Sequence, residues 1–247
     1  MSPTPASVAL IPYYGPGAHA HYEAVRRARL TVASLEGFAS VDAARSLLLE
    51  IGLSRTTAEV FVFIDSDVAF DRAGYDALVA SAHEHQAIVG GAYLTRLGLD
   101  GRQRLASAPA LRPGIVCQFF EHGARYPAVT LGMGFTAIPR AVIEKMVAFH
   151  QMPRCGFRVG DVATTAYPLF QPMIHEGQYR LEDESFCLRA SLAGIPIFVD
   201  TRPKLVHYGE HGHLVCDLRL RSEHDPNFTL EAPRSPIARL ESKGTES

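Results

Sequence analysis

The sequence predicts an α/β fold of the Rossmann-like kind, in which a mostly parallel central sheet carries helices on both faces. Short apolar runs at 8–12, 60–64 and 87–93 alternate with longer segments whose apolar residues recur at helical spacing. Alternation of this type is typical of parallel strands that are connected by helices. The run VFVFI at 60–64 is continuously apolar, which favours a strand covered on both faces.

Apolar spacing and capping residues predict the individual elements. Strands are expected at 8–12, 60–64, 87–93, 115–120, 129–131 and 197–199. Helices are expected at 20–35, 40–53, 71–85, 139–149 and 182–192. Asp71 is a helix-capping residue type, and Gly194 followed by Pro196 is a stop signal for the last helix. The stretch 151–180 is rich in Gly, Pro and aromatic residues, which predicts a long loop or a hairpin excursion.

Length and composition favour a single domain without a strongly charged surface. The chain has 247 residues and is 47% hydrophobic, which is enough to bury the core of one α/β domain. We expect this domain to cover residues 1–230 and residues 231–247, rich in Pro, Ser and charge, to form a flexible tail. Lys plus Arg total 24 against 26 for Asp plus Glu, so the formal net charge of -2 predicts no evident nucleic-acid-binding surface.

Cysteine usage and hydropathy favour a cytoplasmic protein. The four cysteines form no CxxC pair, which argues against a zinc knuckle and against a disulfide-stapled scaffold. The N-terminus lacks a basic region followed by an unbroken apolar stretch, and no window approaches the apolar length of a transmembrane segment. We therefore expect a reducing, cytoplasmic setting and no membrane span.

Two aspartates follow the most apolar of the expected strands. Asp65 and Asp67, separated by Ser66, would place two oxygen donors at the edge of the sheet. In open α/β sheets ligands collect at the carboxyl ends of the strands, and carboxylate oxygens suit hard divalent cations. The same residues would also suit a solvated turn in which Asp bonds to the backbone.

Two further polar elements could complete such a site. Glu182 and Asp183 fall in the first turn of an expected helix, where the helix dipole favours ionised carboxylates. Helix capping alone would also account for them. His207 follows a strand-like segment and is a ligand type that could complete a metal site begun by Asp67, although a single histidine is usually structural.

In this order and spacing, the DSD at 65–67, the Glu-Asp pair at 182–183 and LVHYG at 205–209 resemble the small GT-A glycosyltransferases. The resemblance covers roughly residues 5–215. It extends to VALIPYY at 8–14, VDAARSLLLE at 41–50, GAYLTR at 91–96 and GMGFTAIPRAVIEKM at 132–146. The early helix of the family usually reads Ala-Arg-Asn, whereas Ser46 follows Arg45 here.

The resemblance implies an enzyme that moves a sugar from a nucleoside-diphosphate sugar, UDP- or GDP-linked, to the hydroxyl of an unidentified acceptor. It implies Mn²⁺ or Mg²⁺ held by Asp67 and His207, with Asp65 as a further ligand. Asp183 would be the general base of an inverting reaction, with Glu182 beside it. The implied nucleotide-sugar contacts are Pro12, Tyr13, Asp42, Arg45, Asp65, Ser66, Gly91 and Ala92. The implied acceptor-side residues are Gly132, Met133 and Gly134.

Two other classes of protein are compatible with these residues. A sugar nucleotidyltransferase would also use acidic metal ligands, but its first loop is usually glycine-rich and basic, whereas no Arg or Lys follows Gly15 and Gly17 here until Arg26. A nucleotide-sugar-binding module without activity would keep the same fold. The GxGxxA pattern at 132–137 matches a dinucleotide-binding motif, but the helix expected from Pro139 begins too late for that motif.

Overall fold

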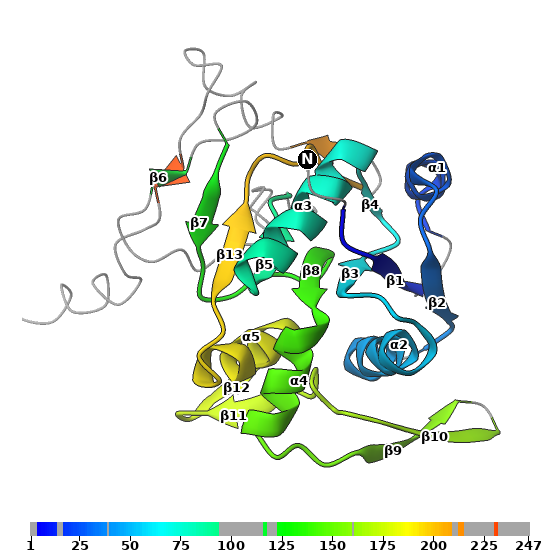
Figure 1. Ribbon diagram of the computed structural model, residues 1–247. Coiled ribbons are helices and arrows are strands. Elements are labelled where there is room, and N and C mark those ends of the chain that lie inside the picture. Colours follow the sequence, from blue (N-terminus) through cyan, green and yellow to red (C-terminus); the bar gives the residue numbers. More distant parts are fainter. Residues whose placement is uncertain are drawn as a thin grey trace, which may run out of the picture.

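A seven-stranded sheet lies at the centre of the computed structural model (Figure 1). The structure describes residues 4–13, 17–38, 40–93, 116–117, 123–159, 161–208, 212–214 and 230–231. The helices are α1 (His19–Ala28), α2 (Val41–Arg55), α3 (Arg72–His85), α4 (Arg140–Phe149) and α5 (Glu182–Leu192). The strands of the central sheet are β1 (Ser7–Tyr13), β2 (Val32–Glu36), β3 (Val60–Ile64), β5 (Ile88–Gly91), β7 (Arg125–Pro127), β8 (Phe135–Pro139) and β13 (Ile197–Asp200).

Short strands outside the central sheet form small ribbons. β4 (Val68–Ala69), β14 (Val206–Tyr208) and β15 (Gly212–Leu214) form one of them. Two hairpins are β9 (Cys155–Val159) with β10 (Val162–Ala166), and β11 (Met173–His175) with β12 (Gln178–Arg180). β6 (Val116–Cys117) pairs with β16 (Leu230–Glu231). The hairpins confirm the hairpin excursion that the composition of 151–180 predicts.

The central sheet is mainly parallel, as the sequence predicts. Its order is β2-β1-β3-β8-β5-β13-β7. β2, β1, β3, β5 and β13 run in one direction, whereas β8 and the edge strand β7 run in the other. Because β8 lies antiparallel between β3 and β5, the residues that lead into it reach the edge at which β3 and β5 end.

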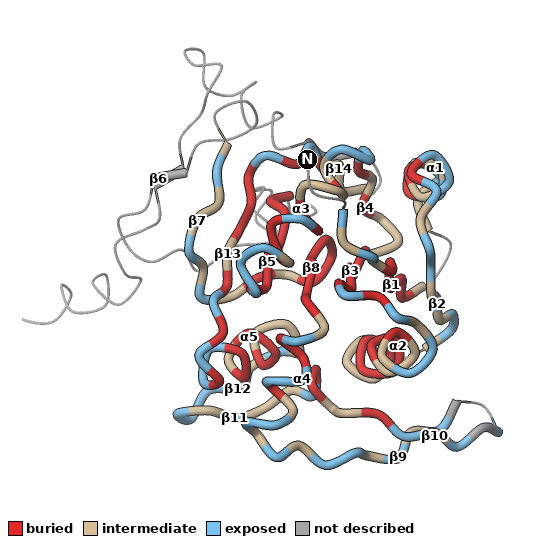
Figure 2. The backbone as a smooth tube through the Cα atoms, viewed as in Figure 1, coloured by how far each residue is buried: buried red, intermediate tan, exposed pale blue. Residues whose placement is uncertain are grey.

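Helices cover both faces of this sheet (Figure 2). Along β3, Phe61 and Phe63 belong to a core cluster with residues of α2, α4 and α5. Val62 and Ile64 alternate with them and belong to a second cluster with residues of α1 and α3. Side chains that alternate between two buried faces explain the continuous apolar run. The α/β class with a mainly parallel sheet is thereby confirmed.

The helix expected at 20–35 is too long by its last seven residues, because α1 ends at Ala28. Arg29 adopts a left-handed conformation (φ 50°) that closes the helix. The chain then forms β2, which pairs in parallel with β1 at the edge of the sheet. Ala33 and Leu35 pack on the core, whereas Val32, Ser34 and Glu36 are exposed, so the burial pattern in this segment is that of a strand.

The strand expected at 129–131 is also misplaced. The pairing segment is β7, which ends at Pro127 and lies antiparallel to β13. After the Ala128 N–H donates to the Ile197 carbonyl oxygen, the chain leaves the sheet. Leu131 is buried, but its N–H donates to the Cys187 sulfur on α5 instead of to a strand.

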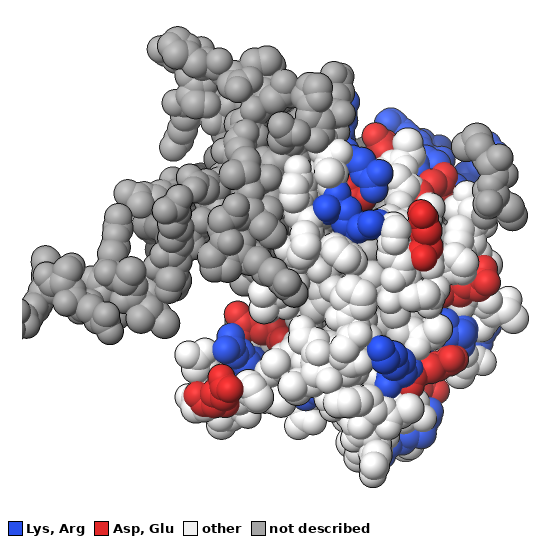
Figure 3. Space-filling view, turned by 60° about the vertical axis from the view of Figure 1, so that its left-hand side comes forward, with Lys and Arg blue, Asp and Glu red and all other residues white. Residues whose placement is uncertain are grey.

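Several predictions from the sequence fall wholly or partly outside the described residues. These are most of the strand expected at 115–120 and nearly all of the tail expected at 231–247. Within the described ranges, none of the helices combines the length and apolar character required to span a membrane. On the face shown in Figure 3, cationic and anionic side chains lie close to one another.

Candidate active site

The candidate site lies at the edge where the parallel strands β1 and β3 end. Tyr13 is the last residue of β1, and Asp65 directly follows β3. The antiparallel strand β8 begins at the same edge, because Phe135 pairs with Ile64. The Asp65 N–H donates to the carbonyl oxygen of Gly134 at 2.9 Å. The sheet therefore brings the DSD turn and the glycine-containing turn before β8 together.

A buried arginine joins two of the predicted acidic elements. Arg45 projects from α2, with a side chain that is 5% exposed. Its Nη2 lies 3.0 Å from Asp65 Oδ1, and its Nη1 lies 2.9 Å from Glu182 Oε1. The two carboxylates are 30% and 19% exposed, respectively. One guanidinium group thus holds the end of β3 and the start of α5 in a fixed relation, because each pair is a charge-assisted hydrogen bond.

Asp67 and His207 are brought together by the small ribbon of β4 and β14. His207 pairs with Val68, and the Tyr208 N–H donates to the carbonyl oxygen of Asp67 at 2.8 Å. The side chains then meet, with His207 Nε2 3.3 Å from Asp67 Oδ2, and they are 12% and 21% exposed. Two residues far apart in the sequence therefore present a nitrogen and an oxygen donor at one place.

These donors suit a cation that shares its coordination with a substrate. Among the described residues, no group of three or more His, Cys, Asp or Glu side chains is arranged to hold a metal ion. Mg²⁺ is often bound by only one or two carboxylates together with substrate phosphates and water. Asp67 and His207 fit such a site. For Asp65, one carboxylate oxygen already accepts from Arg45, so its predicted role as a metal ligand competes with this ion pair.

Asp183 lies in the first turn of α5 beside this network. Burial raises the pKa of its carboxyl group, whereas a hydrogen bond from the Glu184 N–H and the charge of Arg45 act in the opposite direction. The Glu184 N–H donates to Asp183 Oδ1 at 2.7 Å. The pKa of Asp183 lies above its ordinary value because burial outweighs these opposing influences, although a place in the first turn of a helix favours the ionised form.

The predicted acceptor-side residues divide between the site and the core. Gly134 lies at the site: a Cβ atom at this position would overlap the Tyr93 hydroxyl and come within 2.8 Å of Asp65 Oδ2. Met133 is buried in the core cluster on the α2 face. The Gly132 carbonyl oxygen accepts a hydrogen bond from Thr136 Oγ1 at 2.9 Å. Only a glycine allows the chain to pass so close to Asp65.

An aromatic cluster lies at the end of β1. Tyr13 stacks on Tyr22 of α1, with 5.7 Å between ring centroids and 7° between planes, and Tyr22 is 45% exposed. His21 is buried beside them and its Nδ1 lies 2.9 Å from the Val68 carbonyl oxygen. Because the carbonyl can only accept, Nδ1 carries the proton in this contact. Burial lowers the pKa of His21.

The remaining predicted nucleotide contacts have varied surroundings. Pro12 is buried, and the Asp42 carboxylate accepts a hydrogen bond from Ser40. The Ser66 carbonyl oxygen accepts from the Ala18 N–H. Gly91 and Ala92 are packed in the core, and a Cβ atom on Gly91 would lie 2.9 Å from Phe135 Cδ1. Close packing explains Gly91, whereas its predicted contact with a ligand stays a prediction.

Sequence reasoning did not single out Tyr93, His21 or Tyr22 as site residues. Tyr93 belongs to the GAYLTR segment that resembles the glycosyltransferases. The resemblance therefore points to this segment, but not to Tyr93 in particular. His21 and Tyr22 are single residues on a helix, and no spacing in the sequence relates them to Val68 or Tyr13. Their importance depends on contacts between α1 and the ends of β1 and β4.

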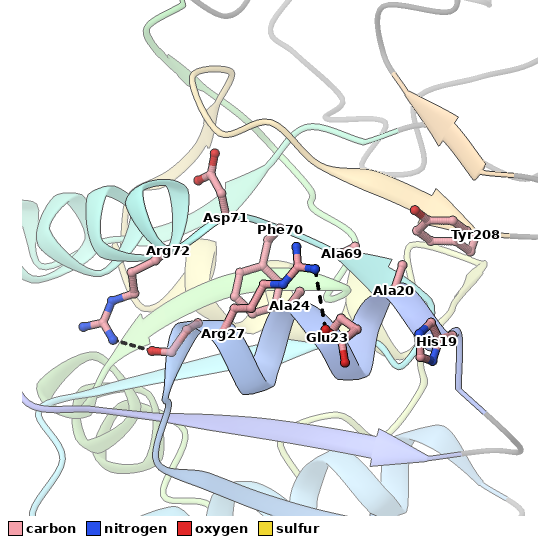
Figure 4. A pocket seen from close by; sticks show the side chains of 11 residues that line it. His19, Ala20, Glu23, Ala24, Arg27, Ala69, Phe70, Asp71, Arg72 and Tyr208 are labelled. Atoms are coloured by element: carbon pink, nitrogen blue, oxygen red, sulfur yellow. Dashed lines mark hydrogen bonds and ion pairs between the residues drawn. The ribbon is translucent and has the colours of Figure 1, made fainter.

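A groove of about 560 Å³ lies between α1, the start of α3 and β14 (Figure 4). It is lined in part by Arg27, Arg72 and Tyr208, and Arg72 and Tyr208 lie at its opposite ends. Arg27 pairs with Glu23, and Arg72 pairs with Asp76. Both cations are thus already offset by a carboxylate. The groove therefore offers little uncompensated positive charge to an anionic ligand.

Comparisons with known proteins bear on the fold. No family model and no curated protein matches the chain. The structure of A197 from STIV matches with a TM-score of 0.54 and 16% identity, over 83% of this chain and 86% of that chain. GalNAc-T7, solved with UDP, GalNAc and Mn2+, matches with a TM-score of 0.49 and 11% identity, over 83% of this chain and 43% of that chain.

A further match is TarS 1-349 from S. aureus, which was solved in two states. The TM-score is 0.43 without a named ligand and 0.41 in complex with UDP-GlcNAc, at 13% identity in both cases. The match covers 79% of this chain and 58% and 56% of those chains. The chain is thus an α/β protein with an acidic site at the carboxyl edge of its sheet. It shares its fold with A197 over most of both chains.

Proposed function

We propose that the chain is a metal-dependent glycosyltransferase of the GT-A type, which moves a sugar from a UDP- or GDP-linked donor to an acceptor hydroxyl. The observation that carries this proposal is the meeting of Asp67 with His207 next to the Asp65–Arg45–Glu182 network. A cation, a diphosphate and a reacting sugar can be accommodated by such an arrangement, because donors for the cation and a carboxylate for the acceptor lie at one edge of the sheet.

Asp67 and His207 would hold Mn²⁺ or Mg²⁺, which when bound stabilises the charge that grows on the departing nucleoside diphosphate. Asp183 would take the proton of the acceptor hydroxyl. A carboxylate whose pKa is raised by burial binds a proton more strongly than an ordinary aspartate, which suits a general base. Arg45 would hold Glu182 and Asp65 in place, and Tyr13 and Ser66 would line the nucleotide.

The first test is ligand-dependent stability. We expect Mn²⁺ and a nucleoside diphosphate together to raise the free energy of unfolding more than either does alone, because each supplies ligands that the other lacks. At about a hundred times Kd the gain is roughly 2.7 kcal/mol. Thermal unfolding with UDP, GDP, CDP and dTDP, each with and without Mn²⁺, measures it. Identical unfolding curves in all conditions contradict the proposal.

The same preparation separates the alternative functions. A glycosyltransferase transfers the sugar of a nucleotide sugar to an acceptor or to water and releases a nucleoside diphosphate. A sugar nucleotidyltransferase instead consumes a nucleoside triphosphate with a sugar phosphate and releases pyrophosphate. An inactive binding module is stabilised by the ligands and releases neither product. Measurement of both products on the ligand-stabilised protein therefore assigns the class.

A second test concerns the shared ion. Asp67→Ala and His207→Ala should each weaken Mn²⁺-dependent binding of nucleoside diphosphate, and the double variant should lose less than the sum, because both side chains serve one cation. Isothermal titration of the single and double variants measures the coupling. His83→Ala is a matched control, since His83 lies on the exposed side of α3 beside Glu59. Fully additive losses mean that the two residues do not share an ion.

A further inference from the structure

Tyr93 lies between the two arms of the candidate metal site. It follows β5 by two positions and is buried. One arm is the end of β3, which carries Asp65, and the other is β14, which carries His207. Tyr93 contacts Gly134, which is hydrogen-bonded to Asp65 of the first arm, and it also contacts His207 of the second arm. It is therefore placed to set the distance between the two arms.

The hydroxyl of Tyr93 is tied to the DSD turn through one residue. The Gly134 N–H donates to Tyr93 Oη at 3.0 Å, and the Gly134 carbonyl oxygen accepts from the Asp65 N–H at 2.9 Å. A Cβ atom at Gly134 would meet both the Tyr93 hydroxyl and Asp65 Oδ2. The phenol and the carboxylate therefore lie on the same side of Gly134, close to each other.

The ring of Tyr93 holds the other arm. It meets the His207 imidazole edge to face, with 5.4 Å between centroids and 68° between planes. Aromatic rings favour this geometry, and it restricts the rotation of the imidazole whose Nε2 faces Asp67. Burial raises the pKa of Tyr93, so its hydroxyl stays neutral and adds no charge beside the carboxylates.

We propose that Tyr93 is a positioning residue that fixes His207 and the Asp65 turn relative to each other before the cation and diphosphate bind. The inference rests on the proposed function. Side chains that orient metal ligands without touching the metal typically contribute about 10- to 100-fold in metal affinity. Tyr93 acts here through its hydroxyl on the Gly134 peptide and through its ring on His207.

The chain contains a matched control for a purely structural tyrosine. Tyr75 on α3 is also buried, belongs to the same core cluster, and donates its hydroxyl to Ser7 Oγ at 3.1 Å. It has no described contact with Asp65, Asp67 or His207. Tyr75→Phe and Tyr93→Phe each remove one buried hydroxyl and keep the ring, so they differ chiefly in their distance from the site.

The experiment measures Mn²⁺ affinity by titration in the presence of UDP and of GDP, together with urea unfolding of each variant. We expect both variants to remain folded, Tyr93→Phe to bind Mn²⁺ about 10- to 100-fold more weakly, and Tyr75→Phe to bind like the unmodified protein. In a transfer assay, Tyr93→Phe should need more Mn²⁺ for half-maximal rate and should recover its rate at saturating Mn²⁺.

Unchanged Mn²⁺ affinity in Tyr93→Phe overturns the positioning role, and so does an equal loss in both tyrosine variants, which would reflect stability alone. If the unmodified protein fails to bind Mn²⁺ both in the presence of UDP and in the presence of GDP, the proposed function fails and this inference fails with it. If the unmodified protein and Tyr93→Phe bind Mn²⁺ with the same affinity, only the inference is refuted. The two failures are therefore distinguishable.

Discussion

Replacement of Asp183 by asparagine is expected to lower sugar transfer by about 10²- to 10⁴-fold and to leave binding of Mn²⁺ and nucleoside diphosphate unchanged. Asparagine keeps the size of the side chain, and its carbonyl oxygen can still accept the hydrogen bond from the Glu184 N–H. What it loses is the ability to take a proton. The loss should therefore fall on turnover and should spare ligand affinity.

Single-turnover transfer and isothermal titration of Asp183→Asn separate these two effects. Glu184→Gln is the matched control, because Glu184 is the next residue of the same helical turn and its carboxylate lies near Arg180. NMR of the product should show the sugar inverted relative to the donor. Near-normal turnover in Asp183→Asn, or retained configuration, would leave Asp183 as a residue that only positions the substrate.

Replacement of Arg45 by methionine is expected to lower the free energy of unfolding by about 3 kcal/mol, because loss of one partner leaves two partly buried carboxylates without their cation. The value lies at the lower end for such changes, since the Asp65 side chain is 30% exposed and water can screen its charge. Methionine keeps most of the apolar bulk of arginine. Urea unfolding of the variant at neutral pH measures the loss.

Two further variants test the origin of this loss. Addition of Glu182→Gln to Arg45→Met should recover part of the lost stability, because it removes one of the uncompensated charges. Arg26→Met removes the exposed partner of Glu23 and should leave the unfolding free energy near that of the unmodified protein. A loss in Arg45→Met as small as that of Arg26→Met would show that the network does not support the fold.

The sequence was most informative where one local pattern decides the structure. β3 is found because every residue of VFVFI is apolar, and α5 is found because a stop signal at Gly194 bounds it. The apolar residues in the second part of 20–35 suit both periodicities, so the sequence predicts a helix where the chain forms β2. The left-handed Arg29 that ends α1 has no distinctive sequence signal, since arginine rarely adopts this conformation.

The contacts of the site were less accessible, because they join residues that only the folded chain brings together. The acidic residues were identified through their order and their resemblance to a family, whereas the Arg45 bridge between Asp65 and Glu182 requires α2, β3 and α5 to be placed in space. The environment of Asp183 depends in the same way on burial. Sequence position gives its helix, but the direction of its pKa follows from the packed surroundings.

Because β8 runs antiparallel to β3, its two ends lie at opposite edges of the sheet. Its first residue, Phe135, pairs with Ile64 beside the DSD turn, and its last, Pro139, pairs with Val60 at the opposite edge. There Arg140 donates hydrogen bonds to carbonyl oxygens of the segment that follows α2. If the proposed function holds, we expect changes in length before β8 to alter which substrates fit, and changes after it to alter how firmly the scaffold holds. Specificity and robustness can thus evolve at opposite ends of a single short strand.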